Sequence, residues 1–308
     1  MKTKKAFLFV AIGVFLSAAV YFGQRYYKEF QRSAQEKLLY ETRKTAWQNL
    51  RQRANAEISR FKGEAGIIIK DLRTGWEFAH DKDKLFPSAS LAKIPLMAAC
   101  FLAAEQGRVK LDRNIALKAS DKLTGSGVLK DMPAGTAFSV ERLIGLMIYD
   151  SDNTATNIVT NLVGIDYLNS AFKSFGLKNT ELSRKIADYK SRDKGIENYT
   201  TAEDMALLLE KIYGKTIGNK NVSDQCMRVL KLTRMNDRIP KYLPPEVSIA
   251  HKTGLEKGVC HDAGVVFTRR GDFVVVVLTR HANSSSLNSK EFIAKISLHA
   301  YEYFSRLQ

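Results

Sequence analysis

The stretch "AGVVFTRRGDFVVVVLTRH", residues 263–281, says most about the fold. Two runs rich in β-branched and aromatic residues flank the turn sequence "RRGD", which predicts an antiparallel hairpin. A second hairpin is predicted near the other end of the chain, in "GIIIKDLRTGWEFAHD" at 66–81, where "RTG" separates two β-rich segments. The two hairpins predict one sheet assembled from both ends of the chain.

The residues between the hairpins favour helices. From about residue 88 to 215 the chain is rich in helix formers and is interrupted by "GSG" at 125–127 and "MPAG" at 132–135. The amphipathic segment "SKEFIAKISLHAYEYFSRL" at 289–307 predicts a closing helix. We therefore expect an α+β fold, with an antiparallel sheet flanked by terminal helices and an all-helical subdomain inserted at about 85–215.

The N-terminus has the pattern of a targeting or anchoring segment. "MKTKK" precedes an uncharged apolar run from Ala6 to Phe22, which predicts a signal sequence or membrane anchor over residues 1–23. We favour an uncleaved anchor that places the rest of the chain outside the cytoplasm. Ser17-Ala18-Ala19 offers a cleavage site, so a secreted form is the alternative. Residues 24–62 predict a helical stalk, and 63–308 a catalytic domain.

The charge of the chain is strongly positive, with 48 Lys and Arg against 32 Asp and Glu. Such a charge favours nucleic acid, an anionic surface such as a membrane or cell-wall polymer, or merely a basic exterior. Because no zinc-finger or RNA-binding signature accompanies it, no nucleic-acid partner is expected.

The cysteine pattern argues against a metal or redox site. Cys100, Cys226 and Cys260 form no CxxC pair, and their odd number leaves at least one thiol unpaired within the monomer. Cys260, His261 and Asp262 are adjacent, and three adjacent side chains rarely converge on one ion. No metal is expected.

Three short motifs carry the chemistry. "SASLAK" at 88–93 places Ser90 three residues before Lys93, "SDN" follows at 151–153, and "KTG" at 252–254 stands just before the last hairpin. Ser-x-x-Lys alone is uninformative, because the chain repeats it at Ser59/Lys62, Ser170/Lys173 and Ser191/Lys194. The three motifs in this order are far more specific.

On these motifs, residues 63–308 resemble the class A β-lactamases and penicillin-binding proteins. "FPSASLAKIPLM" at 86–97 is similar to the nucleophile helix of that superfamily, and "SDNTATN" at 151–157 continues the second motif as the family does. The resemblance implies a helical subdomain set in an α/β subdomain, which agrees with the pattern of hairpins and helices.

The resemblance also implies a role for each motif residue. Ser90 would be the nucleophile and Lys93 its base, because a serine hydroxyl attacks only after a base takes its proton. Lys93 shares the helical face of Ser90, and a nearby Lys252 would favour its neutral form. By the same resemblance, Ser151 would carry the proton to the leaving nitrogen, and Asn153 would bind the substrate amide. Lys252, Thr253 and Gly254 would bind the substrate carboxylate. The backbone N–H groups of Ser90 and Leu255 would form the oxyanion hole. This chemistry needs no cofactor.

One loop departs from the family pattern. Class A β-lactamases carry Arg-x-Glu-x-x-x-Asn there, and its glutamate activates the deacylating water. In "TELSRKIADYKSRDKGIENYTT" at 180–201, Thr180, Leu182 and Arg184 match, but Ile186 holds the glutamate position and Lys190 the asparagine position. Asn198 stands where an acid usually clamps the arginine. Ile186 cannot accept a proton. Asp188, two residues away, could substitute for the glutamate where the loop backbone differs from the family's.

We therefore predict a penicillin-recognising serine hydrolase that is acylated at Ser90. The missing glutamate gives a slight preference for a D,D-peptidase acting on D-Ala-D-Ala ends over a β-lactamase with altered deacylation. A non-catalytic β-lactam or cell-wall sensor is the alternative of another class. The expected partners are β-lactams or peptidoglycan stem peptides, and the membrane through the N-terminal segment. The expected location is extracytoplasmic, anchored or secreted, in the periplasm or at the cell surface.

Overall fold

The fold is taken from a computed structural model that describes residues 2–282 and 285–306, with side chains from residue 20 to 305 apart from the same gap. The chain divides into two units, and Arg51–Ser305 form the larger one. The smaller unit consists mainly of the N-terminal part of α1 (Lys2–Arg60). Ion pairs one turn apart, Arg25–Glu29 and Arg32–Glu36, support this solvent-exposed helix.

The predicted membrane anchor lies mostly outside the described side chains, which begin only at residue 20. Within the described part, no helix offers an apolar stretch long enough to cross a bilayer.

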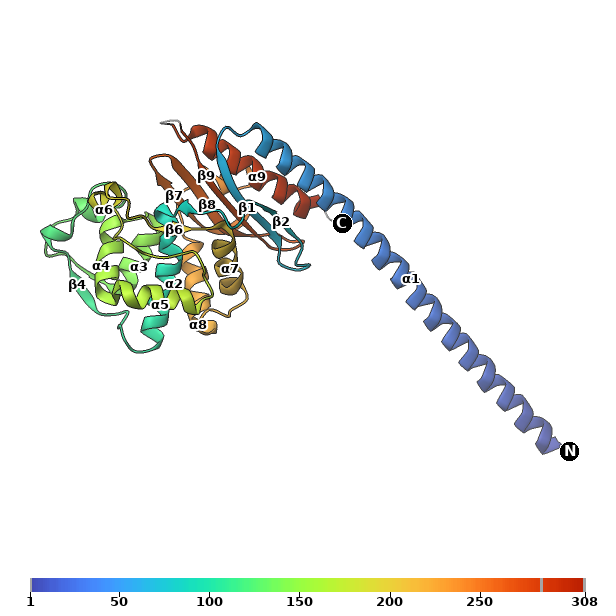
Figure 1. The fold of residues 1–308 in the computed structure, drawn as a ribbon. Helices are drawn as coiled ribbons and strands as arrows, with labels where there is room; N and C mark the ends of the chain where they lie inside the picture. The colour runs from blue at the N-terminus through green and yellow to red at the C-terminus, as the bar shows by residue number, and fades with distance from the viewer. Residues whose placement is uncertain (1, 283–284, 307–308) are drawn as a thin grey trace. The chain divides into compact units, whose positions relative to one another are not determined.

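A five-stranded antiparallel sheet forms the base of the larger unit (Figure 1). Its strands have the order β2-β1-β9-β8-β7, with the bounds β1 Glu64–Asp71, β2 Glu77–His80, β7 Ser248–Glu256, β8 Val259–Phe267 and β9 Phe273–Arg280. Both predicted hairpins are present, and β1 pairs with β9 from Glu64↔Arg280 to Asp71↔Phe273. The pairing of the chain's two ends confirms the predicted α+β fold.

The two faces of the sheet carry different layers, because successive side chains of a strand alternate between faces. Ile68, Val276, Ala263 and Lys252 lie opposite one another across four strands and share one face. This face turns toward the helical core that includes α7 (Ala202–Tyr213) and α8 (Lys220–Leu230).

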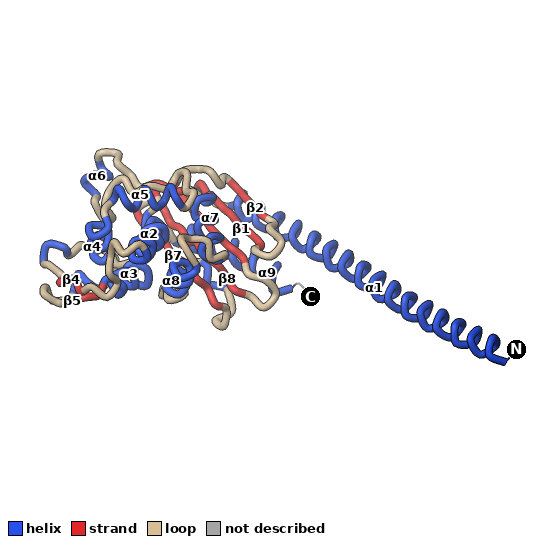
Figure 2. The backbone as a smooth tube through the Cα atoms, turned by 90° about the horizontal axis from the view of Figure 1, so that it is seen from below, coloured by secondary structure: helices blue, strands red, loops and turns tan. Residues whose placement is uncertain are grey.

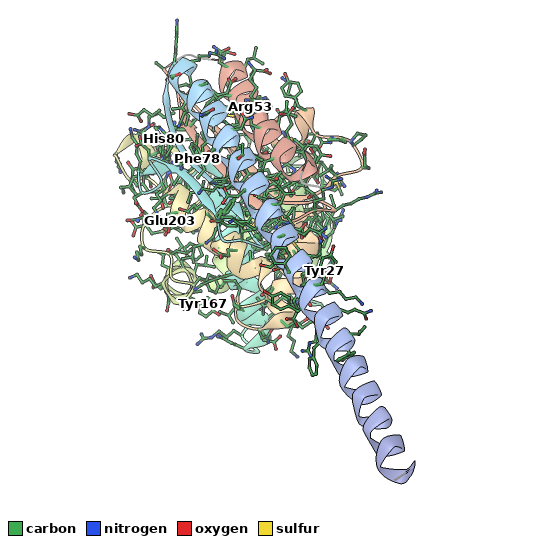
Figure 3. The ribbon with its side chains drawn as sticks, turned by 90° about the vertical axis from the view of Figure 1, so that its right-hand side faces the viewer. Tyr27, Arg53, Phe78, His80, Tyr167 and Glu203 are labelled. Carbon is green, nitrogen blue, oxygen red and sulfur yellow. The ribbon has the colours of Figure 1, made fainter. Side chains whose placement is uncertain are left out.

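The opposite face is covered by α9 (Leu287–Arg306). Phe273 of β9 stacks on Phe304 with ring centroids 4.5 Å apart. The end of α1 lies beside α9, where Phe61 stacks on Phe292 at 4.3 Å and Arg53 forms an ion pair with Glu302 (Figure 3). Terminal helices therefore flank the sheet as predicted.

The helical layer surrounds α2 (Lys93–Glu105), which is buried along most of its length (Figure 2). An apolar helix without a polar face must lie inside the fold, and "KIPLMAACFLAAE" has this character. The remaining helices extend to Leu230, beyond residue 215; they are α3 Val140–Tyr149, α4 Asn153–Val163, α5 Ile165–Ser174, α6 Tyr189–Asp193, α7 and α8.

Short elements complete the layer. They are the strand pairs β3 Phe86–Pro87 with β6 Tyr199–Thr200 and β4 Asn114–Ala116 with β5 Ala137–Ser139, and the 3₁₀ turns η1 Ala89–Ala92, η2 Ala119–Asp121, η3 Leu129–Asp131 and η4 Ile239–Tyr242. Of these, β3 and η1 position the first motif.

Candidate active site

Ser90 lies in the 3₁₀ turn η1, three residues before the start of α2, rather than within the α-helix itself. The residue before it, Ala89, has φ of 44°, a left-handed backbone conformation that is costly for a residue with a Cβ. Such strain persists only where the surrounding structure holds it, and it is frequent at active sites. The sharp turn ends β3 and starts the helix.

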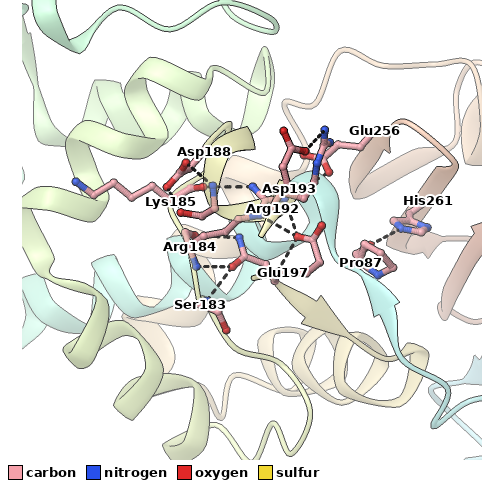
Figure 4. Close-up of polar contacts among 12 residues, drawn as sticks. Pro87, Ser183, Arg184, Lys185, Asp188, Arg192, Asp193, Glu197, Glu256 and His261 are labelled. Atoms are coloured by element: carbon pink, nitrogen blue, oxygen red, sulfur yellow. Dashed lines mark hydrogen bonds and ion pairs between the residues drawn. The ribbon is translucent and has the colours of Figure 1, made fainter. Parts of the chain in front are cut away.

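His261 of β8 holds the segment that leads into this turn. The backbone N–H of Thr279 donates to its Nδ1 at 3.0 Å, so the ring proton sits on Nε2, which donates to the carbonyl of Pro87 at 2.8 Å (Figure 4). Burial lowers the pKa of His261 to about 4, so the ring is neutral at physiological pH. The contact fixes the backbone three residues before Ser90.

Gly254 allows β7 to approach η1 closely. A Cβ at this position would lie 3.4 Å from the Cβ of Ala89 and 3.2 Å from Cδ2 of His261. Because both distances are short for a contact between carbon atoms, a side chain at this position would push the strand away from the turn. Ser90 and Leu255, whose N–H groups are the predicted oxyanion donors, therefore belong to two elements in direct contact.

The turn of the second motif is fixed by Asp152, which caps α4. Its carboxylate accepts hydrogen bonds from the N–H groups of Ala155 at 2.8 Å, Val128 at 2.7 Å and Leu129 at 2.8 Å. The cap satisfies the first turn of the helix and ties it to the preceding loop. Ser151 itself has φ of 54°, so a second strained residue stands in the site.

Three side chains meet at the hydroxyl of Ser151. Lys93 Nζ donates to Ser151 Oγ at 3.1 Å, Lys252 Nζ donates to the same oxygen at 3.0 Å, and Ser151 Oγ donates to Ser90 Oγ at 3.0 Å. We call Ser90, Lys93, Ser151 and Lys252 the Ser151 relay. It joins residues 162 positions apart in the sequence.

Lys93 does not bond directly to Ser90 in the part of the chain that the structure describes. Its Nζ lies 2.6 Å from the carbonyl oxygen of Ser151, 3.1 Å from Ser151 Oγ and 2.9 Å from Oδ1 of Asn153. The expectation of a direct contact from Ser-x-x-Lys spacing is therefore replaced by a connection through Ser151. The physical reason is that three oxygens of Ser151 and Asn153 already lie within hydrogen-bond distance of Nζ.

The electrostatics of the relay favour a neutral amine. Both lysines have no exposed surface. Burial, and the charge of Lys252 beside it, hold the pKa of Lys93 well below its usual range, against an opposing effect of Asp152 and Glu256. Burial also lowers the pKa of Lys252 to about 7. A lysine in this state can accept a proton near neutral pH.

The other residues of the third motif are buried beside the relay. Lys252 Nζ also donates to the carbonyl of Thr253 at 2.9 Å, and the side chain of Thr253 is 5% exposed. Below them, His251 pairs with Asp262 at 2.9 Å, and Asp262 accepts the N–H of Ile239 at 3.1 Å. This buried network holds β7 and β8 in place behind the motif.

Ile186 occupies the backbone position that the sequence predicts for the missing glutamate. Its carbonyl accepts a hydrogen bond from Nδ2 of Asn157 at 2.9 Å, and its side chain is 6% exposed. The side chain therefore contributes to the apolar core and offers no group that could bind a water.

The arginine clamp of the loop differs from the sequence prediction. Glu197, rather than Asn198, binds Arg184, with its Oε1 at 2.6 Å from Nη2 and 3.1 Å from Nε (Figure 4). Asn198 holds the backbone instead, accepting from the N–H groups of Ser183 at 2.8 Å and Arg184 at 2.9 Å. Glu197 therefore binds the Arg184 side chain, and the adjacent Asn198 binds the loop backbone.

Asp188 is engaged within its own helix. Its carboxylate caps α6 by accepting from the N–H of Ser191 at 3.1 Å and from Ser191 Oγ at 2.7 Å (Figure 4). These hydrogen bonds lower the pKa of Asp188, which makes it a weaker base than an ordinary carboxylate. Both oxygens thus have local partners.

Sequence reasoning missed Glu256, the last residue of β7. Its carboxylate lies 3.6 Å from Nη2 of Arg184, and its side chain is 16% exposed. Burial raises the pKa of Glu256 despite the nearby arginine. Strand alternation from Lys252 was the available signal, since residues 252, 254 and 256 share one face.

The remaining Ser-x-x-Lys pairs and the cysteines are placed away from the relay. Ser59 bonds its own helix through the carbonyl of Ala56, Ser170 and Lys173 are exposed on α5, and Ser191 bonds Asp188. The three cysteines are free and buried. Within the described residues, no three His, Cys, Asp or Glu side chains are grouped to hold a metal.

Comparison with known proteins agrees with this geometry. A family model described as "Beta-lactamase enzyme family" matches residues 49–304. Among curated proteins, beta-lactamase VEB-1 of Pseudomonas aeruginosa is 25% identical over 240 residues, covering 72% of this chain and 80% of that protein. A beta-lactamase of Streptomyces lavendulae is 27% identical over 238 residues, covering 75% and 78%.

Solved structures give the same result. The beta-lactamase of Sphaerobacter thermophilus superposes with a TM-score of 0.77 at 31% identity, covering 84% of this chain and 98% of its own. PBP-A superposes with a TM-score of 0.76 at 30% identity, covering 84% and 96%. A variant of PBP-A was solved as an acyl-enzyme complex with penicillin G.

Fold and similarity together define a serine hydrolase of class A β-lactamase type. The chain belongs to the beta-lactamase enzyme family.

Proposed function

We propose that Ser90 is acylated by D-Ala-D-Ala peptides and by β-lactams, and that the protein acts as a D,D-peptidase. The observation that carries the proposal is the buried hydrogen-bonded relay from Lys93 and Lys252 through Ser151 to Ser90. A serine joined to a neutral amine in this way is an activated nucleophile.

Acylation proceeds by proton transfer within the relay. With Lys93 neutral, the two hydroxyl protons turn so that Ser90 Oγ donates to Ser151 Oγ and Ser151 Oγ donates to Lys93 Nζ. As Ser90 Oγ adds to the substrate carbonyl carbon, its proton then passes to Ser151 while Ser151 passes its own to Lys93. The oxyanion that forms is stabilised by the N–H groups of Ser90 and Leu255. When the carbon–nitrogen bond breaks, Ser151 gives a proton to the leaving nitrogen and regains one from Lys93, so the relay returns to its starting state.

Four residues bind the substrate in this proposal, and one of them, Lys252, also belongs to the relay. Lys252, Thr253 and Gly254 hold the carboxylate that both D-Ala-D-Ala and β-lactams carry. Asn153 binds the substrate amide through the end of its side chain that does not accept from Lys93. We also propose that the N-terminal segment anchors the protein or directs its secretion, so that the site faces the cell wall.

The preference for a peptidase rests on the loop. Ile186 cannot prepare a water, and both oxygens of Asp188 are bound within α6. Without a base on this loop, a β-lactam acyl-enzyme should hydrolyse more slowly than in a class A β-lactamase, and slow hydrolysis is how penicillins trap D,D-peptidases. The acyl-enzyme complex of a PBP-A variant with penicillin G supports acylation of Ser90 by penicillins.

A β-lactamase is the second candidate, favoured by the names of the curated relatives. In that case, turnover of a chromogenic cephalosporin should be rapid. Asp188→Asn would then abolish it if Asp188 replaced the missing glutamate.

Mass spectrometry of the protein mixed with penicillin tests the proposal. We expect a long-lived adduct on Ser90 that Ser90→Ala abolishes and that Ser170→Ala, at an exposed serine with the same motif, leaves intact. Equal labelling of both variants would disprove the assignment of the nucleophile. Absence of any adduct on the unaltered protein would leave a non-catalytic cell-wall sensor.

A further inference from the structure

Glu256 is a carboxyl group without a settled partner. Its nearest cation is Nη2 of Arg184 at 3.6 Å, and no hydrogen bond to its carboxylate occurs in the part of the chain that the structure describes. Arg184 is already bound twice by Glu197 at shorter distances. A carboxylate that is only 16% exposed normally accepts several hydrogen bonds, so its oxygens are available to another molecule.

Glu256 lies on the same face of β7 as Lys252 of the relay. It shares the strand face of Lys252, whose Nζ reaches Ser151, because residues two and four apart point the same way. Gly254 lies between them on this face and has no side chain to intervene. Leu255, the predicted oxyanion donor, is the adjacent residue.

Glu256 on β7 contacts the loop in which Ile186 replaces the family's glutamate. Arg184 belongs to the loop that carries Ile186, and its guanidinium contacts Glu256 across to β7 (Figure 4). The loop has no glutamate at position 186, but β7, which contacts the loop through Arg184, carries the carboxylate of Glu256.

The charges around Glu256 suit a base. Arg184, Arg192 and Lys93 favour its ionised form, whereas burial, the largest influence, and Glu197 raise its pKa. A carboxyl with a raised pKa accepts a proton more readily at neutral pH than an ordinary glutamate does.

We propose that Glu256 is the general base for the water that deacylates Ser90, supplied from the end of β7 in place of the loop glutamate. This inference rests on the proposed acylation of Ser90. The water oxygen adds to the ester carbonyl carbon while Glu256 takes one water proton. Glu256 passes this proton to the neutral Lys93 through solvent, and as the bond to Ser90 Oγ breaks, Lys93 gives a proton through Ser151 to Ser90, so that both groups return to their starting state. The product leaves as a carboxylic acid.

The half-life of the penicillin adduct on Ser90, followed by intact mass, tests the inference. Glu256→Gln should lengthen it at least tenfold, while the rate of adduct formation stays within about threefold of the unaltered protein, because a general base contributes roughly 100-fold or more. Glu256→Asp should restore part of the rate. Glu181→Gln, at an exposed loop glutamate bound to Ser183 Oγ, is the matched control and should change nothing.

The pH dependence of the deacylation rate shows whether Glu256 acts as a base or only as a structural contact. Deacylation of the unaltered protein should slow as pH falls through the pKa of Glu256, and the Glu256→Gln rate should be flat over that range. An unchanged half-life in Glu256→Gln, with the adduct still formed, would overturn this inference alone. Failure of the unaltered protein to form an adduct would overturn the proposed function and this inference together.

Discussion

The Ser151 relay and the loop at 180–200 both adjoin the segment that carries Ser90, but they keep the family pattern to different degrees. In the relay, Ser90, Lys93 and Lys252 each form a hydrogen bond with Ser151. The loop keeps its backbone contacts, including Asn157 to the carbonyl of Ile186, but carries an apolar side chain at the position of the glutamate. The backbone of the loop is therefore maintained separately from its chemistry.

The two regions are also held by different forces. Buried hydrogen bonds and strained backbone at Ala89 and Ser151 fix the relay. Ion pairs to Arg184, whose side chain is 2% exposed, fix the loop. Substitutions in the relay should consequently affect chemistry, and those in the loop should affect stability.

Lys93→Met should break the relay with the largest effect. Removing the amine leaves Ser90 without a base, so the acylation rate should fall by roughly 100- to 10,000-fold. Because a buried amine of lowered pKa contributes little to folding, the melting temperature should not fall in proportion. Labelling by a fluorescent penicillin measures the rate. Lys173→Met is the control, and a similar loss there would refute the distinction between the two motif copies.

Glu197→Gln tests the loop by removing the charge that pairs with Arg184. A buried guanidinium that loses its partner should cost about 3 kcal/mol in the free energy of unfolding, measured by urea denaturation. Asp193→Asn is the control, since its pair with Arg192 is at 3.8 Å with the acid 74% exposed. It should cost less than about 0.5 kcal/mol. Similar costs for the two variants would contradict the assigned clamp.

His261→Gln sharpens the comparison through pH. The pKa of His261 is about 4 in the fold and 6.5 when unperturbed, so from pH 6.5 down to 4 only the unfolded chain takes up this proton. Acidification over that range should therefore destabilise the native protein by up to about 3 kcal/mol through this group. The variant should lack this part of the slope in its free energy of unfolding. Parallel pH curves for the two proteins would show that the ring is not buried and neutral.

The sequence by itself determined the fold class and the three motifs. Two hairpins at the ends of the chain predict the sheet, and the order of the motifs identifies Ser90 among four Ser-x-x-Lys pairs. Such features depend on residues close together in sequence, where helix and strand periodicity fixes which side chains share a face.

Only the tertiary structure decided how the motifs connect. It made Ser151 the centre of the relay, moved the clamp from Asn198 to Glu197, and brought Glu256 to Arg184. These contacts join separate elements, and a shift of one residue in a loop or strand changes which side chain arrives. Spacing within one element cannot determine that, because it depends on how distant elements pack.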